Sequence, residues 1–370
     1  MATIYLHIGS PKTATSTLQS ALSSKSDDLR SQGILYPRNH RNGTAHHLLI
    51  LDLSAKYTRS TPPNYWYGSM PRGAAWASLL SEIRDFGPGL ESVVLSSELF
   101  FAQVSSLSSI LTEIREKLTG HSIKIVIYLR RQDQLFSSFY NQDIKGQRLW
   151  SRSAYDFYNV HQLFQQEYSV TLNAWADIFG EENIIVRPFD KATLNGGNIE
   201  TDFWGIIGAK GTTVSGNFEN SGLGENQVYL KRCLNISGFD KEENGDILNM
   251  LLGLVEEPPA KGIHYIDRNS YRKYRQGWVR DNKILADRFL GGGQLFLEEI
   301  PLPEEITLHK VDEKVIENFI VKVSECAESN SLGKYFEIFA RAAIHASIEL
   351  KLWGGLDSKI RAALSNASKG

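Results

Sequence analysis

The chain has 370 residues, with 40 basic and 42 acidic side chains and a formal net charge of −2. This length supports a large core in one elaborated domain or two, and the near-neutral charge argues against bulk binding to nucleic acid or an anionic membrane. Cys233 and Cys326 lack CxxC or histidine spacing, which argues against a disulfide framework or metal knuckle. Because no membrane-span pattern or signal region is recognisable, we expect a reducing, cytoplasmic location.

The N-terminal segment, MATIYLHIGSPKTATSTLQS, predicts a strand, a polar loop and a helix. Residues 3–8 alternate and are rich in β-branched and aromatic side chains, and Gly-Ser-Pro at 9–11 breaks the strand. The loop at 12–17 offers one ammonium group and four hydroxyl groups, and the leucines from Leu18 onward have helical spacing. Because a helix start presents free N–H groups and a positive dipole end, we expect an anion site there. The alternative is an ordinary turn with an N-cap threonine.

Strands and helices alternate along the rest of the chain. Strands are predicted at residues 33–37, 92–96, 123–129 and 183–189, and helices at 48–56, 76–86, 107–118, 155–176, 227–235, 242–255, 268–288, 320–326 and 335–353. The IKIVIYL run at 123–129 is nearly all apolar, which is typical of a parallel strand buried on both faces. We therefore expect a three-layer α/β sandwich with a central parallel sheet. Residues 1–210 would form its core, and residues 211–370 would be a mainly helical extension that completes the same domain.

A carboxylate and two histidines are candidate catalytic groups. Glu98 directly follows the strand at 92–96, and ligands collect at the carboxyl ends of strands in open α/β sheets. Its apolar neighbours should desolvate the carboxyl group and raise its pKa towards a value useful for a general base. The alternative is a first-turn glutamate that complements a helix dipole. His46 and His47, in a polar loop at 38–47, could be metal ligands or a base, or simply hydrogen-bonded loop histidines.

A second cluster of polar residues follows the strand at 123–129. Arg130 comes directly after it, and the next predicted helix carries Ser138. A buried strand that delivers an arginine, followed by a serine on a helix, can build a second anion site. The alternative is a surface arginine beside a solvated helix.

Both polar segments resemble motifs of sulfotransferases that use 3′-phosphoadenosine 5′-phosphosulfate (PAPS). PKTATSTLQ resembles the 5′-phosphosulfate loop, usually P-K-[ST]-G-[ST]-[ST]; Ala14 replaces the glycine, which tolerates φ angles that alanine avoids. YLRRQDQLFSSFYN resembles the 3′-phosphate motif, in which an arginine at a strand end and a serine further along the helix hold that phosphate. Arg130 and Ser138 have that spacing. The likeness covers mainly residues 1–145, and residues 187–189 resemble the "RPF" segment of soluble bacterial members.

The resemblance implies a role for each site residue. Lys12 would neutralise the leaving 5′-phosphate, and Glu98 stands where cytosolic members carry a catalytic histidine and some carbohydrate sulfotransferases use glutamate. His47 is the competing candidate for the base. The residues implied to bind the donor are Pro11, Lys12, Thr13, Ala14, Thr15, Ser16, Thr17, Arg130 and Ser138.

The implied activity is in-line transfer of a sulfuryl group from PAPS, with adenosine 3′,5′-bisphosphate (PAP) as product and no metal. The acceptor would be a hydroxyl or amine of a small molecule or glycan, with carbohydrate favoured over a natural product and no nucleic-acid partner. One alternative is a noncatalytic nucleotide- or glycan-binding module, since the late arginine-lysine-glycine clasp of cytosolic members has no recognisable counterpart. The other is a P-loop kinase, which is disfavoured because the loop lacks the GK[ST] of a Walker A motif.

Two aromatic-rich segments leave their roles open. The tyrosines and tryptophan of residues 59–72 could line a sugar or aryl acceptor, or could pin that loop to the core. Residues 268–288 combine many cations with aromatic side chains, as in surfaces that bind RNA or an acidic glycan. The alternative for 268–288 is the solvated face of a helix.

Overall fold

The computed structural model describes residues 1–39, 41–58, 71, 73–102, 107–161, 167–211, 222–329 and 331–352. The chain folds into two compact units whose segments alternate along the sequence. The sheet unit comprises Met1–Leu135, Gln166–Phe218 and Tyr274–Ile300; the helical unit comprises Phe136–Gln165, Glu219–Lys273 and Pro301–Gly370. The grouping therefore differs from a single division at residue 210. That residues 211–370 complete the domain of residues 1–210 stays a prediction.

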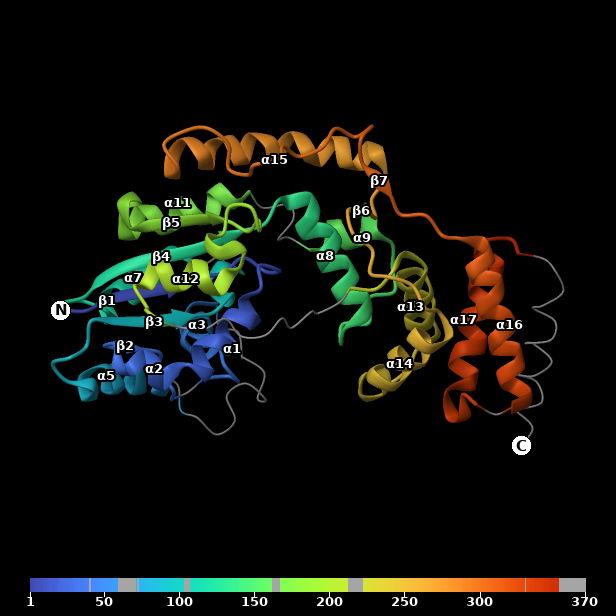
Figure 1. Ribbon diagram of the computed structural model, residues 1–370, viewed down its shortest axis with the longest axis horizontal. Helices are drawn as coiled ribbons and strands as arrows, with labels where there is room; N and C mark the ends of the chain where they lie inside the picture. Colours follow the sequence, from blue (N-terminus) through green and yellow to red (C-terminus); the bar gives the residue numbers. More distant parts are fainter. Residues whose placement is uncertain are drawn as a thin grey trace. The chain divides into compact units, whose positions relative to one another are not determined.

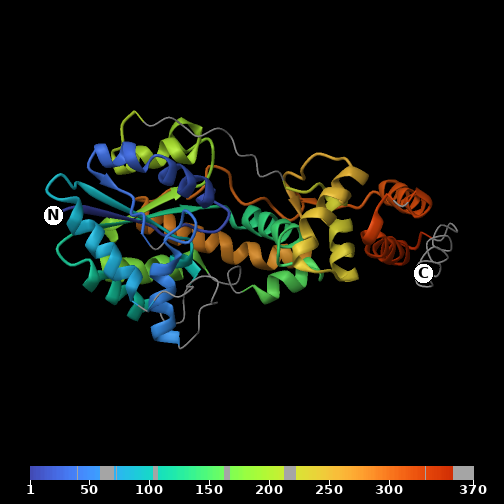
Figure 2. The same ribbon diagram turned by 90° about the horizontal axis from the view of Figure 1, so that it is seen from below.

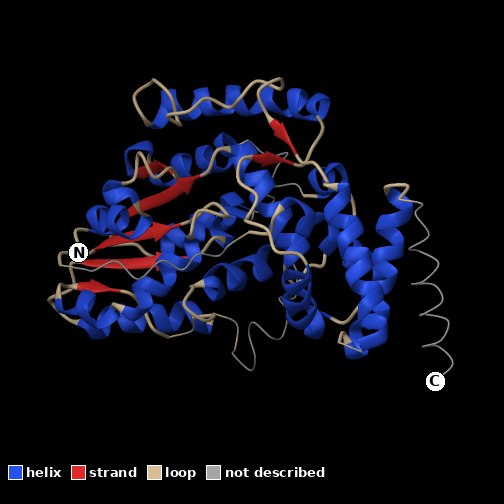
Figure 3. Cartoon of the chain, turned by 45° about the vertical axis from the view of Figure 1, so that its right-hand side comes forward, coloured by secondary structure: helices blue, strands red, loops and turns tan. Residues whose placement is uncertain are grey.

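The sheet unit is built on a five-stranded parallel sheet with the order β2-β3-β1-β4-β5 (Figures 1 and 3). The strands are β1 (Thr3–His7), β2 (Ile34–Leu35), β3 (Ser92–Ser96), β4 (Ser122–Leu129) and β5 (Ile184–Pro188). Thr3 lies opposite both Ser92 and Ser122, so the three central strands begin level and run in one direction. The residues that follow β1, β3 and β4 therefore emerge at the same edge. The predicted parallel sheet is confirmed.

Helices cover both faces of this sheet, as Figure 2 shows. A buried cluster that includes Leu22, Val126 and Phe203 joins one face to α1 (Thr15–Ser24), α2 (Ser26–Ser31) and α12 (Ile199–Ile207). The helices packed together on the other side are α3 (His47–Thr58), α5 (Ala74–Phe86), α6 (Leu99–Ala102), α7 (Leu107–Lys117) and α11 (Tyr168–Phe179). The sheet unit is therefore a mixed α/β structure of three layers.

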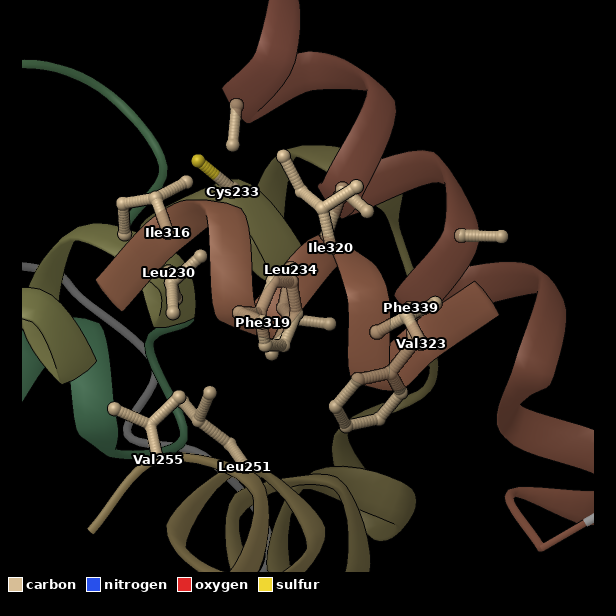
Figure 4. Packing of buried hydrophobic residues seen from close by; sticks show 14 of the residues in the cluster. Leu230, Cys233, Leu234, Leu251, Val255, Ile316, Phe319, Ile320, Val323 and Phe339 are labelled. Carbon is tan, nitrogen blue, oxygen red and sulfur yellow. The ribbon is translucent and has the colours of Figure 1, made fainter. Parts of the chain in front are cut away.

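The helical unit is organised around a second apolar cluster (Figure 4). Leu234, Leu251, Phe319 and Phe339 are among its buried members. The helices that supply the cluster are α13 (Glu225–Ser237), α14 (Asn244–Leu254), α16 (Glu313–Ser329) and α17 (Phe336–Glu349). The unit also contains α9 (Ala154–Val160), β6 (Ile263–His264) and β7 (Thr307–Leu308), while α8 (Gln132–Lys145) and α15 (Arg268–Phe289) contribute residues to both units. Short 3₁₀ turns span Glu181–Asn183, Asn195–Gly197, Lys241–Glu243 and Gly333–Tyr335.

Two sequence predictions of secondary structure were wrong. The helix expected at 155–176 is not continuous, because the backbone is extended at His161 after α9 and α11 begins only at Tyr168. A carboxylate distant in sequence caps α11: Asp281 accepts hydrogen bonds from the backbone N–H groups of Tyr168 (2.7 Å) and Ser169 (3.0 Å). The strand at 183–189 was expected to be the last, yet β6 and β7 follow as a parallel pair of two residues each. Strands this short leave no periodic pattern.

Residues 59–70 and 72 lie outside the described residues, and with them the tyrosines and tryptophan that could line an acceptor or pin their loop to the core. Within the described ranges, no helix combines the length and apolar character needed to cross a lipid bilayer.

Candidate functional site

The loop after the central strand β1 makes a tight turn into α1. Gly9, Lys12 and Ala14 all have positive φ angles, of 30°, 63° and 55°. A Cβ atom on Gly9 would lie 3.1 Å from Thr15 Oγ1 and 3.4 Å from His7 Nε2, so glycine allows close approach to β1 and to the helix start. Ala14, which stands in place of the family's glycine, nevertheless takes the left-handed conformation as the N-cap of α1. The loop therefore has the backbone geometry that the glycine pattern predicts.

The hydroxyl groups of this loop are not equivalent. Thr13 is fully buried, and its Oγ1 donates a 2.6 Å hydrogen bond to the carbonyl oxygen of Ser10, which closes the loop on itself. Thr15 is also buried, whereas Ser16 is exposed and Thr17 is half-buried. Ser16 and Thr17 are thus the loop hydroxyls most available to a ligand.

The start of α1 has the properties of an anion site. In the described structure its N-cap residue, Ala14, makes no side-chain capping bond, and its first turn contains no acidic residue. The N–H groups of Thr15, Ser16 and Thr17 precede the first intrahelical bond, from Leu18 N to Ala14 O at 3.1 Å. These donors and the positive end of the helix dipole favour a negative group beside the loop.

Arg130 brings the end of β4 to this loop. Its Nη1 donates to the carbonyl oxygen of Lys12 at 3.2 Å, and its own carbonyl accepts a 2.8 Å bond from the Tyr168 hydroxyl. Burial lowers the pKa of the Arg130 guanidinium, and the nearby Asp133 opposes this shift. The two predicted anion motifs therefore meet through Arg130 and Lys12. Ser138 lies on α8 in the helical unit, so its joint role with Arg130 stays a prediction.

Glu98 and His47, the two competing candidates for the base, form one pair. His47 Nε2 lies 3.7 Å from Glu98 Oε1, and His47 Nδ1 lies 2.7 Å from Ser97 Oγ. Ser97 Oγ also accepts the Leu99 N–H at 3.2 Å, so this hydroxyl links His47 to the start of α6.

The environments of the paired groups differ. Burial lowers the pKa of His47, and the Glu98 charge partly opposes this shift. The His47 side chain is 11% exposed but that of Glu98 is 33% exposed, so the desolvation expected for Glu98 is only partial. Glu98 can therefore contact solvent or a ligand, while the more buried His47 contacts its carboxylate from the protein side.

Gln19 connects this pair to the helix that begins at the loop after β1, and sequence reasoning missed it. Its Nε2 donates to Glu98 Oε2 and to Ser96 Oγ, each at 3.2 Å, and Ser96 Oγ lies 2.8 Å from His7 Nδ1. Gln19 and Thr15 are four residues apart on α1, so they share one helix face. A polar side chain one turn after a loop of hydroxyls was the available signal.

His46 has a structural role. Its Nδ1 accepts the Ser96 N–H at 3.1 Å, and its Nε2 donates to the Pro37 carbonyl oxygen at 3.1 Å. Burial lowers its pKa to about 3. Because both ring nitrogens are engaged and the ring is held neutral, His46 fixes the loop that presents His47.

The "RPF" segment is part of a hydrogen-bond network inside the sheet unit. Arg187 donates through Nε and Nη2 to Asp202, which also accepts from the Tyr128 hydroxyl at 2.8 Å and from Asn195 N at 2.9 Å. Burial opposes ionisation of Asp202, but these hydrogen bonds, with Arg187 foremost, outweigh it and lower the pKa. The network ties β4 and β5 to α12.

The basic and aromatic segment 268–288 forms α15, and many of its cations are paired. Arg272 binds Glu304, Arg280 binds Glu167, and Lys283 binds Asp287. Its aromatic residues Tyr271 and Trp278 are buried. These contacts favour the alternative of a helix face over a polyanion surface. A pocket of about 190 Å³ nevertheless lies on the sheet-unit half of α15, lined in part by Val279, Lys283, Leu295, Phe296 and Ile300.

Comparisons with known proteins give two similarities. No family model matches the chain. An uncharacterized protein of Archaeoglobus fulgidus is 25% identical over 270 residues, which cover 70% of this chain and 72% of that protein. Among solved structures, a sulfotransferase from Alicyclobacillus acidocaldarius aligns with a TM-score of 0.39 and 15% identity, over 77% of this chain and 95% of that one.

Proposed function

We propose that the protein is a sulfotransferase that moves a sulfuryl group from PAPS to a hydroxyl acceptor. The observation that carries this proposal is the Gln19 link, because one side chain on the helix that begins at the anion-type loop also holds Glu98. An anion site and a proton acceptor on the same edge of a parallel sheet are what an in-line group transfer needs.

The chain's own residues would bind and orient the donor. The Lys12 ammonium group, the α1 N–H groups and the exposed Ser16 hydroxyl would contact the 5′-phosphosulfate, whose negative charge they complement. Arg130 and Ser138 would hold the 3′-phosphate. The bond from Arg130 to the Lys12 carbonyl supports this assignment, because it couples the shape of the 5′ loop to the 3′ site.

In the transfer step, Glu98 takes the proton of the acceptor hydroxyl, and the acceptor oxygen attacks the sulfur atom. The bond between sulfur and the 5′-phosphate oxygen breaks, and its electron pair leaves with PAP. Lys12 stabilises the charge that develops on that oxygen. His47 orients Glu98 through their 3.7 Å contact and is the second candidate to receive the proton. We favour a carbohydrate hydroxyl as acceptor, since some carbohydrate sulfotransferases use a glutamate base.

An acceptor panel tests the activity. The protein is incubated with PAPS and with sugars, phenols, amines and a tyrosine peptide, and mass spectrometry follows each acceptor and the nucleotide. We expect one acceptor class to gain a sulfuryl group in step with release of PAP. Tight binding of PAPS without release of PAP from any mixture would favour the binding module, and transfer of phosphate from ATP would favour the kinase.

A further inference from the structure

A cysteine, a histidine and a glutamate from two helices converge in the helical unit, far from the site described above in sequence. Cys233 lies on α13, and His345 and Glu349 lie on α17. In the described part of the chain, one ligand atom from each residue lies within 4.8 Å of the other two. Figure 4 shows Cys233 among the apolar residues of the cluster.

The helix geometry explains why these residues meet. His345 and Glu349 are four residues apart and therefore share one face of α17, where His345 Nε2 lies 3.3 Å from Glu349 Oε2. Ala342 and Ala346 are fully buried on α17, and such small side chains allow α13 to approach closely. The packing of α13 against α17 therefore brings these three residues together.

The donor atoms match the preferences of zinc. Thiolate, imidazole and carboxylate are its usual protein ligands, and bonds of about 2.0–2.3 Å set tetrahedral ligand atoms roughly 3.3–3.8 Å apart. The His345–Glu349 distance already has this value, and the Cys233 sulfur lies within 4.8 Å of both ligand atoms. Three protein ligands would leave the fourth position for water or another small ligand.

The surroundings provide orientation and access. Arg232 Nη2 lies 2.9 Å from Glu349 Oε1 and 3.0 Å from Oε2, so it can keep Oε1 while Oε2 turns to a cation. Cys233 is buried, but the His345 and Glu349 side chains are 38% and 40% exposed, which gives an ion a path from solvent.

We infer that Cys233, His345 and Glu349 form a binding site for a zinc-type divalent metal ion. Binding replaces the thiol proton by the metal: the S–H bond breaks, a sulfur–metal bond forms, and one proton passes to solvent. Sequence spacing argued against a metal knuckle because these ligands come from helices far apart in the chain.

Titration of the metal-free full chain with Co²⁺ tests the inference. We expect one equivalent to bind with a sulfur-to-cobalt absorption band in the near ultraviolet, and Zn²⁺ to displace it and raise the melting temperature. Cys233→Ser should abolish the band, while Cys326→Ser, at the other cysteine, should retain it.

His345→Gln provides a second test that does not disturb the core, because this side chain is partly exposed. It should weaken Zn²⁺ binding at least tenfold while circular dichroism remains unchanged. A wild-type chain with no cobalt band would overturn the inference and leave only an ion-pair cluster with Arg232. Binding that survives both Cys233→Ser and His345→Gln would also overturn it.

Discussion

The two units bury titratable groups in different ways. In the sheet unit, Glu98 follows the end of β3 and pairs with His47 at the start of α3, and Glu98 keeps 33% of its side chain exposed. In the helical unit, Lys231 is fully buried; its Nζ donates to Asn235 on the same helix and lies 4.9 Å from the centre of the Phe239 ring. Burial lowers the pKa of Lys231 to about 7.

This difference distinguishes the candidate site from a packed core. Lys231 donates to Asn235 within α13 and is fully buried, whereas Glu98 is held by Gln19 and still reaches solvent. A perturbed pKa alone would have pointed to Lys231. Partial exposure, convergence of several strand ends and strained backbone point instead to the loop and to Glu98.

The largest expected effect is that of Glu98→Gln. The amide retains an oxygen for the Gln19 bond but cannot accept a proton, so turnover should fall by about 10²–10⁴-fold while nucleotide binding survives. Because His47 contacts Glu98, His47→Gln should also lower turnover, and the double variant should lose less than the product of the two single effects. Turnover of the single and double variants, measured at saturating donor, checks both expectations.

Glu91→Gln is the matched control, since Glu91 is exposed just before the amino end of β3 and should leave turnover unchanged. If Glu98→Gln were nearly fully active while His47→Gln was inactive, His47 would be the base.

Leu234→Ala should show how the helical unit differs from the sheet unit, because it should affect stability instead of chemistry. Leu234 is fully buried in the helical cluster, and such truncations cost about 2–5 kcal/mol of unfolding free energy. Denaturant unfolding measures the loss, and Leu234→Met should cost less than about 1.5 kcal/mol. A loss below about 1 kcal/mol for Leu234→Ala would show that this cluster is loosely packed.

Acid should weaken the sheet unit through its buried neutral histidines. Burial lowers the pKa of His46 to about 3 and that of His7 to about 3. Below about pH 6.5 the unfolded chain therefore binds protons that the folded chain does not. As the pH is lowered from about 6.5 to 3, the unfolding free energy should fall by about 1.4 kcal/mol per pH unit for each histidine. His46→Gln should remove one such contribution from the slope, and an unchanged slope would contradict the assignment.

The smallest expected effect is a gain from Ala14→Gly. A left-handed alanine costs about 1–2 kcal/mol, and glycine relieves this strain. Glycine also makes the unfolded chain more flexible, which offsets about 0.4–1 kcal/mol of the gain. We expect a net stabilisation of roughly 0.5–1 kcal/mol in denaturant unfolding. Ala77→Gly, at an exposed helical position in α5, should instead destabilise by about 1 kcal/mol. If both variants lost stability equally, Ala14 would not be strained.

Much of the sheet unit could be predicted from the sequence. The IKIVIYL run predicted β4, because burial on both faces leaves an unbroken apolar stretch. The residues after β1 predicted the loop and α1. The placement of Glu98 at the end of β3 followed from the same strand pattern.

Contacts between residues far apart in the chain could not be predicted. The start of α11 depends on Asp281, more than 100 residues away, and the pairing of His47 with Glu98 joins the start of α3 to the end of β3. Gln19 has no motif of its own, and only the folded α1 brings it to Glu98. Local pattern identifies elements and strand ends, whereas the partner of each side chain depends on tertiary packing.

The most direct test of the central claim is unfolding in the presence of PAP. With this nucleotide at about 100 times its dissociation constant, the unfolding free energy should rise by roughly 2.7 kcal/mol. Lys12→Met, which removes the loop's ammonium group, should abolish most of that gain at the same nucleotide concentration. An unmoved wild-type transition, or a rise with ATP and magnesium but not with PAP, would contradict the assignment of the loop after β1 as the donor site.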